Sequence, residues 1–290
     1  AGDNGNTDID IQNGSVINGK ILAGGAGTHD ITLRDSRIQG GSILLSSTKN
    51  DNTISVINSS IDTTGAVTAT DNAINITNGS TPDKTHAVTI DNSRITGSVN
   101  IASTGSTNAL SVKDSTISKT IQADGNAVTM KNGATTLLTL DNSEVSGHAL
   151  LSGTGSITAS LAQARLHGNL TASKAAQIAL EITASTLDGI LDASAGSDAA
   201  LNVTDSTLGN SDQADGTALS LKGEKTAFLT LSNSGVNGHT LLEGSESVSA
   251  TLDNAQISGN LVASGAARTT LDITRSTVKD NIEAGQGSVD

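Results

Sequence analysis

The 290-residue sequence has no cysteine, no tryptophan and no tyrosine, and it contains one phenylalanine, Phe228, and one proline, Pro82. Compact globular proteins usually depend on large aromatic side chains for core area, so their scarcity argues against a thick globular core. A narrow β-helix can be filled by Leu, Ile, Val and Ala alone. The missing cysteine fits an exported bacterial protein that must stay unlocked during secretion, and it also fits many cytosolic proteins.

No apolar run is long enough to span a bilayer, and no signal peptide opens the chain. The formal net charge of -13 repels phosphate backbones and anionic lipid headgroups. We therefore expect no binding to nucleic acid or to a membrane surface. Residues 285–290 show no capping segment for a sheet edge, so we expect the sequence to be a mature piece of a longer chain.

One short segment, L-T-L-D-N-S-E-V-S-G at residues 138–147, returns about a dozen times along the chain. With Leu140 as the anchor of this segment, the equivalent anchors are Ile11, Leu33, Val56, Ile90, Val112, Leu161, Ile182, Val203, Leu231, Leu252 and Ile273. From Leu140 to Val203 the anchors follow at intervals of 21 residues. A repeat of this length indicates a solenoid.

Three columns of the aligned repeats are apolar throughout: the anchor, the residue two before it and the residue five after it. The third of these columns holds Val16, Ile38, Ile61, Ile95, Ile117, Val145, Leu166, Leu187, Leu208, Val236, Ile257 and Val278. The residue directly before each anchor is polar, and apolar–polar–apolar alternation predicts a strand with one buried face. A helical solenoid would need apolar residues at i, i+3, i+4 and i+7, and the repeats do not have them.

A polar corner separates the anchor from the next apolar column. Its second place mostly holds Asn or Asp: Asn13, Asp35, Asn58, Asn92, Asp114, Asn142, Asp205, Asn233 and Asn254. These residues tolerate bent backbone conformations and suit a corner that must be repeated. We therefore predict an all-β fold, a single-stranded parallel β-helix of about 12 coils with about 21 residues per coil.

The coils are expected to form one rod over residues 9–290 after a loose start at residues 1–8. Residues 203–290 repeat residues 112–199 by a shift of 91, and each copy contains one enlarged coil of 28 residues. The coil that starts at Val56 is longer still, because the next anchor is Ile90. Its residues 78–86 include Pro82 and are the best candidate for a protruding loop.

Several of these coils resemble the passenger domains of bacterial type V autotransporters, in the pertactin-like and AIDA-like group. The segments that carry the resemblance are residues 138–147, residues 218–242 (A-L-S-L-K-G-E-K-T-A-F-L-T-L-S-N-S-G-V-N-G-H-T-L-L) and residues 248–265 (V-S-A-T-L-D-N-A-Q-I-S-G-N-L-V-A-S-G). The likeness covers about residues 9–284. It implies a right-handed parallel β-helix, held at the outer-membrane surface by a C-terminal barrel, with a role in adhesion, aggregation or biofilm growth. The sequence departs from the family in having no barrel, no serine-protease motif and no R-G-D triplet.

Catalysis by a nucleophilic triad would need a histidine close to a serine and an acid, and no G-x-S-x-G elbow occurs. The five histidines are His29, His86, His148, His167 and His239. His148 and His239 are copies of one another by the 91-residue shift. We expect these histidines to lie at the surface or at corners.

Polysaccharide lyases and hydrolases are the enzymatic alternative, because they also use parallel β-helices. They need clustered carboxylates and aromatic platforms for sugar rings. Asp91, Asp141 and Asp253 share one column, but they do not all lie on adjacent coils, and the platforms are missing. Residues 24–28 give one broken match to the repeat of calcium-binding β-rolls. We therefore predict that the protein is not an enzyme and that it has no catalytic residue, no metal site and no cofactor.

Outward-facing polar residues before and after the anchors form a flat strip rich in hydroxyls and carboxylates. We call the following nine residues the polar strip: Thr89, Asp91, Thr139, Asp141, Ser160, Thr230, Ser232, Thr251 and Asp253. The strip is either the solvated wall of a β-helix or a surface on which two identical rods meet antiparallel. Many weak polar contacts add up along a repeated strip, so we predict self-association between neighbouring cells, in aggregation and biofilm formation.

The alternative is an adhesin for a host matrix protein or glycan. Its contact residues would be Asn78, Asp83, Lys84 and His86 in the predicted loop. In both cases we expect the protein at the bacterial cell surface, secreted across the outer membrane and tied to the membrane only through a missing C-terminal barrel.

Overall fold

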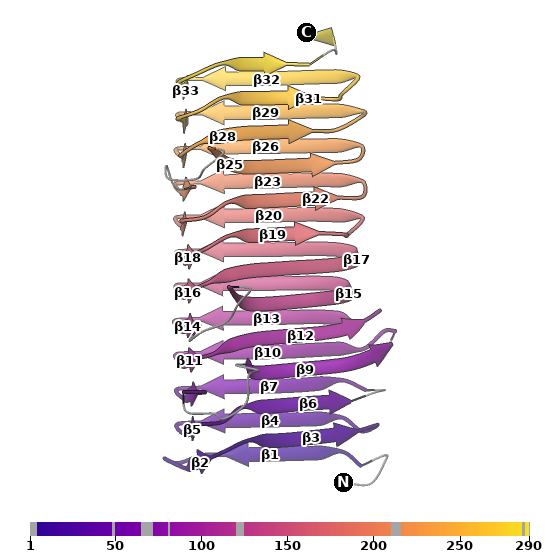
Figure 1. Cartoon of the computed structure of the whole chain (residues 1–290), viewed down its shortest axis with the longest axis vertical. Helices are drawn as coiled ribbons and strands as arrows, with labels where there is room; N and C mark the ends of the chain where they lie inside the picture. The colour runs from indigo at the N-terminus through magenta and orange to yellow at the C-terminus, as the bar shows by residue number, and fades with distance from the viewer. Residues whose placement is uncertain are drawn as a thin grey trace. The chain divides into compact units, whose positions relative to one another are not determined.

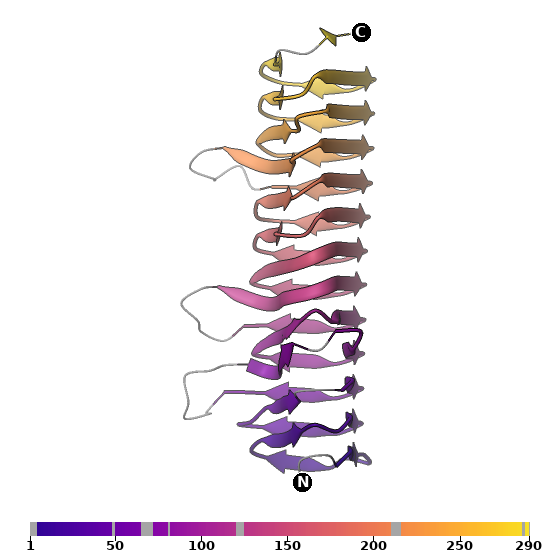
Figure 2. The same ribbon diagram turned by 90° about the vertical axis from the view of Figure 1, so that its right-hand side faces the viewer.

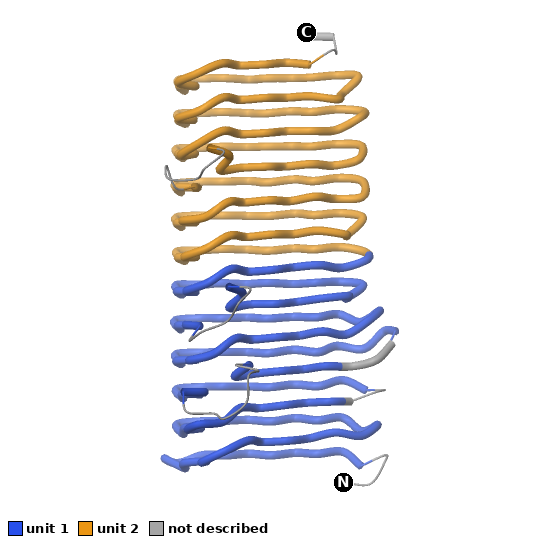
Figure 3. Tube along the Cα trace, in the orientation of Figure 1, with its two compact units in different colours: residues 1–154 blue, residues 155–290 orange. Residues whose placement is uncertain are grey.

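The computed structural model describes residues 5–47, 50–64, 72–80, 82–119, 125–209, 216–285 and 288–289. The chain is all-β and forms a parallel β-solenoid of about 12 turns, in which equivalent positions of successive turns are about 22 residues apart in the sequence. This confirms the predicted fold class. It divides into two compact units, residues 1–154 and residues 155–290 (Figure 3). No helix among the described residues is long and apolar enough to cross a membrane.

Each coil has a first strand that carries the anchor, a short second strand after the corner and a third strand (Figure 1). The first strands are β1 (Thr7–Ile11), β4 (His29–Arg34), β7 (Asn52–Ile57), β10 (Thr85–Asp91), β13 (Thr107–Lys113), β20 (Gln177–Thr183), β23 (Asp198–Thr204), β26 (Thr226–Ser232), β29 (Ser247–Asp253) and β32 (Arg268–Thr274). The short strands are β2 (Val16–Asn18), β5 (Arg37–Gln39), β8 (Ser60–Asp62), β11 (Arg94–Thr96), β14 (Thr116–Ser118), β16 (Glu144–Ser146), β18 (Arg165–His167), β21 (Thr186–Leu187), β24 (Thr207–Leu208), β27 (Gly235–Val236), β30 (Gln256–Ile257) and β33 (Thr277–Val278).

The third strands close each coil and lead into the next one. They are β3 (Ile21–Gly25), β6 (Ile43–Ser47), β9 (Asn72–Ser80), β12 (Ser98–Thr104), β19 (Leu170–Ser173), β22 (Leu191–Ala195), β25 (Thr217–Gly223), β28 (His239–Glu243), β31 (Leu261–Ser264) and β34 (Ile282–Ala284). Two long strands, β15 (Asn126–Asp141) and β17 (His148–Ala162), serve as the third strand of one coil and the first strand of the next. A last short strand, β35 (Ser288–Val289), pairs with β32.

Within each unit, equivalent strands pair in parallel and equivalent residues lie one above the other. In unit 1, Leu110 pairs with Leu138 and Val112 pairs with Leu140. In unit 2, Ile182 pairs with Val203. All six side chains are buried, so the apolar columns predicted from the sequence form the core of the solenoid. Figure 2 shows the stacked coils of each unit edge-on.

The corner after each anchor contains one residue other than glycine in the left-handed backbone region, with φ between 44° and 60°. These residues are Asn13, Asp35, Asn58, Asn92, Asp114, Asn142, Gln163, Ala184, Asp205, Asn233, Asn254 and Arg275. Asn and Asp are the residues other than glycine that adopt this conformation most readily. The backbone therefore explains the Asn and Asp at the corner, and the conformation persists where Gln163, Ala184 and Arg275 replace them.

The duplicated motif Q-A-D-G keeps its glycine for a steric reason. Gly125 has a φ of +74°, and a Cβ atom there would lie 2.6 Å from Cδ2 of His148. Gly216, in the other copy, has a φ of +71°, and its Cβ atom would lie 3.0 Å from Cδ2 of His239. Each glycine and its histidine are therefore retained as a packed pair.

Two details of the first coil differ from the sequence-based prediction. The coil begins at Thr7 rather than at Ile9, because Thr7 and Asp8 pair with β4. At the first corner, Ile17 rather than Val16 stacks on Ile38, and Val16 is 41% exposed. The cause is one additional residue in that corner, where Asn13 and Gly14 both have positive φ.

Candidate functional site

The polar strip has separate parts in the two units. In unit 1, Thr89 and Thr139 lie two coils apart, because both are stacked in register with residues of β13. Asp91 and Asp141 are likewise two coils apart, and Lys113 lies between them. Over these three coils the outward column after the anchors alternates in charge, and Ile57 and Arg34 precede them in the column. The predicted polar strip contained acids and hydroxyls but not Lys113.

In unit 2, four residues of the polar strip occupy two adjacent coils. Thr230 pairs with Thr251, and Ser232 pairs with Asp253. Ser160 is three coils away from Thr230 in the same column. Arg275 binds the Asp253 carboxylate at 2.6 Å, so this aspartate already has a cationic partner within its own unit.

A second outward column, three residues before the anchors, contains large apolar side chains that were not assigned to any site. Leu137 in unit 1 is 38% exposed, and Phe228 in unit 2 is 44% exposed. The two positions are equivalent under the 91-residue shift. Each continues a row of small residues on its own unit, Ala87 and Ala109 before Leu137 and Ala179 and Ala200 before Phe228. The outer sheet of each unit thus carries an apolar row beside its polar strip.

Only part of the expected protruding loop lies in a connection between strands. Asn78 belongs to strand β9, and Thr81 falls outside the described residues. Asp83 and Lys84 belong to a short connection that ends at β10. His86 is fully buried within β10. The prediction of a protruding loop over the whole of residues 78–86 is therefore wrong, because strand pairing continues to both sides of Pro82. His86 cannot contact a partner from the interior.

His86 is part of a buried polar column inside unit 1. From coil to coil the column reads His29, Asn52, His86, Asn108 and Thr136, and all five side chains are fully buried. Asn52 Nδ2 lies 3.1 Å from His86 Nδ1. Burial lowers the pKa of His86, and the nearby Asp51 carboxylate partly opposes this. The expectation of surface or corner histidines is thus wrong for His29 and His86.

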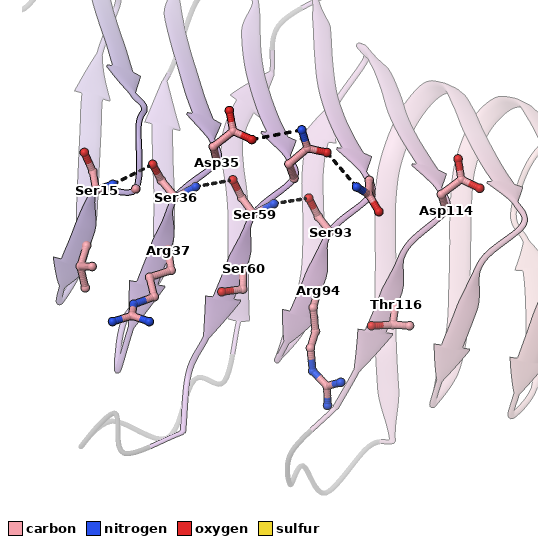
Figure 4. A pocket seen from close by; sticks show the side chains of 14 residues that line it. Ser15, Asp35, Ser36, Arg37, Ser59, Ser60, Ser93, Arg94, Asp114 and Thr116 are labelled. Carbon is pink, nitrogen blue, oxygen red and sulfur yellow. Dashed lines mark hydrogen bonds between the residues drawn. The ribbon is translucent and has the colours of Figure 1, made fainter.

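A groove of about 720 Å³ lies on the surface of unit 1 (Figure 4). It follows the corner between the first and second strands across five coils. Its lining residues are Gly14, Ser15, Val16, Asp35, Ser36, Arg37, Asn58, Ser59, Ser60, Asn92, Ser93, Arg94, Asp114 and Thr116. The sequence had suggested no site here.

A ladder of buried serines forms the floor of the groove. Ser36 N–H donates to Ser59 Oγ at 3.1 Å, and Ser59 N–H donates to Ser93 Oγ at 2.9 Å. Each hydroxyl also donates to the carbonyl two residues before it, as Ser59 Oγ does to Ile57 O at 2.6 Å. The serines are thereby held in one geometry and satisfy the corner backbone, so their first role is structural.

Polar side chains of the corner form one wall of the groove. Asn58 Nδ2 donates to Asp35 Oδ1 at 3.1 Å, and Asn92 Nδ2 donates to Asn58 Oδ1 at 2.9 Å. Figure 4 shows Arg37, Ser60, Arg94 and Thr116 on the opposite side of the serine ladder. The two arginine side chains point in the same direction, away from Asp35. The groove therefore offers cations on one side and acceptors on the other.

The described residues include no group of three His, Asp or Glu side chains that could hold a metal ion. Asp198 has a pKa below its usual value, because the hydroxyls of Thr226 and Ser197 donate to its carboxylate. Thr226 Oγ1 lies 2.6 Å from Asp198 Oδ1. These groups stabilise one another where the paired strands β23 and β26 of unit 2 begin.

Comparison of the chain with models of protein families, with curated proteins and with solved structures finds no match to any of them. The two surfaces with the most regular chemistry, the polar strip and the groove of unit 1, are therefore the features from which a function is argued.

Proposed function

We propose that the chain is the passenger of a bacterial autotransporter at the cell surface, and that the polar strip joins it to copies of itself on neighbouring cells. This is a binding role, without catalysis or a cofactor. The observation that supports it most directly is the outer column of unit 1, where Asp91, Lys113 and Asp141 stack in register. Alternating charge is what a self-complementary surface requires.

The physical argument depends on a two-fold relation between copies. When two copies face each other with their coils running in opposite directions and offset by one coil, Lys113 of each copy faces an aspartate of the other. Single exposed ion pairs contribute only about 0.2–1 kcal/mol each. The apolar row that ends at Leu137 lies on the same sheet and adds burial of apolar area. Many copies on each cell then raise the strength of attachment by avidity.

Settling of bacteria that display the chain tests this proposal. Lys113→Glu makes the three stacked positions 91, 113 and 141 all acidic, and we expect these cells to stay suspended. Lys174→Glu, at an exposed turn position of unit 2, changes the net charge equally and should leave settling unchanged. Cells with Lys113→Glu should settle when mixed with cells that carry Asp91→Lys and Asp141→Lys. If Lys113→Glu cells settle like the wild type, the polar strip is not the contact.

A second candidate function is attachment to a host matrix protein or glycan. The buried position of His86 removes part of the loop that had been assigned to this contact. The groove gives the same function another location, because its residues Arg37 and Arg94 lie in a different sheet from the polar strip.

A further inference from the structure

We propose that the groove of unit 1 binds an extended acidic polysaccharide with one carboxylate per disaccharide, and that Arg37 and Arg94 bind successive carboxylates. This inference is independent of self-association, because Arg37 and Arg94 lie in the sheet of short strands and the polar strip lies in the sheet of first strands. It follows from the positions of the two arginines, their lack of partners and the chemistry of the opposite wall.

The two arginines have a fixed separation along the solenoid. Arg37 and Arg94 both pair with Ser60, from the two neighbouring coils. Successive coils are about 4.8 Å apart, so the two Cα atoms are about 10 Å apart. This span is close to the length of one disaccharide in an extended glycan. A chain that runs along the groove would therefore bring every second sugar to an arginine.

Both guanidinium groups are available to a ligand. In the part of unit 1 that the structure describes, neither Arg37 nor Arg94 forms an ion pair or a side-chain hydrogen bond, and both residues are exposed. Arg165 occupies the equivalent column of unit 2, and it pairs with Asp188 at 3.4 Å. The planar fork of arginine binds a carboxylate through two parallel hydrogen bonds. The pair in unit 1 thus offers two guanidinium groups to which two carboxylates can bind.

The remaining lining favours a sugar over a simple anion. Ser60 and Thr116 place hydroxyl groups next to the arginines, and Asp35 and Asp114 place carboxylates on the opposite wall. These oxygens accept hydrogen bonds from sugar hydroxyls, and the aspartates repel a ligand that is anionic on all sides. The groove therefore fits a glycan with carboxylates along one edge and hydroxyls along the other. A densely sulfated chain fits it less well.

Binding of a hyaluronan octasaccharide, which alternates uronic acid with a neutral sugar, tests the proposal by calorimetry on the full chain. A neutral chitin oligosaccharide of the same length serves as the ligand control. We expect the wild type to bind the acidic ligand only, and heparin more weakly. The double variant Arg37→Gln, Arg94→Gln should lose affinity by at least about tenfold. Arg165→Gln removes an arginine from the same column and should bind like the wild type.

Three results would overturn the proposal: no binding of the octasaccharide by the wild type, equal binding of the neutral oligosaccharide, or unchanged affinity in the double variant. Circular dichroism checks that the variants fold. A salt titration of the wild type needs no variant, and affinity that does not fall with salt would also contradict the proposal. Cell settling should persist in the double variant, so a failure of self-association and a failure of glycan binding are distinguishable.

Discussion

Asn52 and His86 lie one above the other inside unit 1, with Asn52 Nδ2 3.1 Å from His86 Nδ1. Both side chains are fully buried. The contact needs a neutral imidazole, because an Nδ1 that carries a proton cannot accept from the amide. The outer columns suggest how the protein binds, and this inner column determines how its stability responds to pH.

We predict that unit 1 loses stability in mild acid. Burial lowers the pKa of His86 from its model-compound value of 6.5, so the unfolded chain binds a proton before the folded chain does. Stability is therefore complete above about pH 6.5 and falls as the pH drops from there toward the lower pKa of the folded state. Chemical denaturation between about pH 7.5 and about pH 5 measures this slope.

The variant His86→Asn is the matched control for the pH prediction, because Asn52 and Asn108 occupy the same column. Its unfolding midpoint should depend less on pH across this interval than that of the wild type. An identical pH dependence in the two proteins would show that His86 is not responsible.

A second prediction concerns His29, whose Nδ1 and Nε2 atoms are buried without a hydrogen-bond partner among the described residues. In unit 2 the same column holds Ile157 and Ile178. Because a buried polar group without a partner costs about 1–3 kcal/mol, His29→Leu should raise the free energy of unfolding by about 1 kcal/mol. His167→Leu, which removes a 2.6 Å contact with Asp188 at the surface, should not raise it. Destabilisation by His29→Leu would mean that the imidazole is satisfied in solution.

The corner residue Ala184 provides a third prediction. Its φ of 49° lies in the left-handed region, which costs an L-residue other than Asn, Asp or Gly about 1–2 kcal/mol. Ala184→Asn should therefore increase the free energy of unfolding by roughly 0.5–1 kcal/mol. Ala179→Asn, at an exposed site of an extended strand, should give no gain. Thermal or chemical denaturation of the two variants compares them directly, and equal effects would contradict this explanation.

The serine ladder allows a fourth prediction. Ser59→Ala removes the acceptor of the buried Ser36 N–H, and an orphaned buried donor costs about 1–3 kcal/mol. We expect the free energy of unfolding to fall by that amount. Ser60→Ala changes the neighbouring hydroxyl, which makes no side-chain hydrogen bond in the described part of unit 1, and should change stability by no more than about 0.5 kcal/mol. If both variants have the same stability, the ladder is not a stabilising element.

The sequence was sufficient to predict the coils, because the residues that determine each coil lie close together in the chain and recur in every repeat. The alternation around Leu140 determines which side chains face inward, and the residues at the corner reflect a backbone conformation that every coil needs. The third strands were not predicted. Their inward residues are pairs such as Val99 and Ile101, which lie 9 and 11 residues after the anchor Ile90. This spacing changes in the enlarged coils, where Leu219 and Leu221 lie 16 and 18 residues after the anchor Val203.

The sites were harder to predict from the sequence, because each is made of residues that occupy the same column in different coils and are far apart in the chain. Arg37 and Arg94 stand in the same column of the repeat, four residues after their anchors. Their shared position could be seen in the sequence. Only the structure shows that, among the described residues of unit 1, neither side chain has an ion-pair or hydrogen-bond partner. His29 and His86 likewise share a column that holds apolar residues such as Ile157 and Ile178 in unit 2. The sequence indicated the buried polar column by placing histidines where other repeats carry an inward-facing apolar residue.

Sedimentation of the purified chain over a range of concentrations tests the central claim, that the polar strip makes the protein associate with itself. The account predicts that the wild type forms a reversible dimer or larger species as concentration rises, weakened by salt. Lys113→Glu should remain monomeric, and an equimolar mixture of Lys113→Glu with the Asp91→Lys, Asp141→Lys variant should associate again. A wild type that stays monomeric at every concentration and ionic strength would contradict the claim.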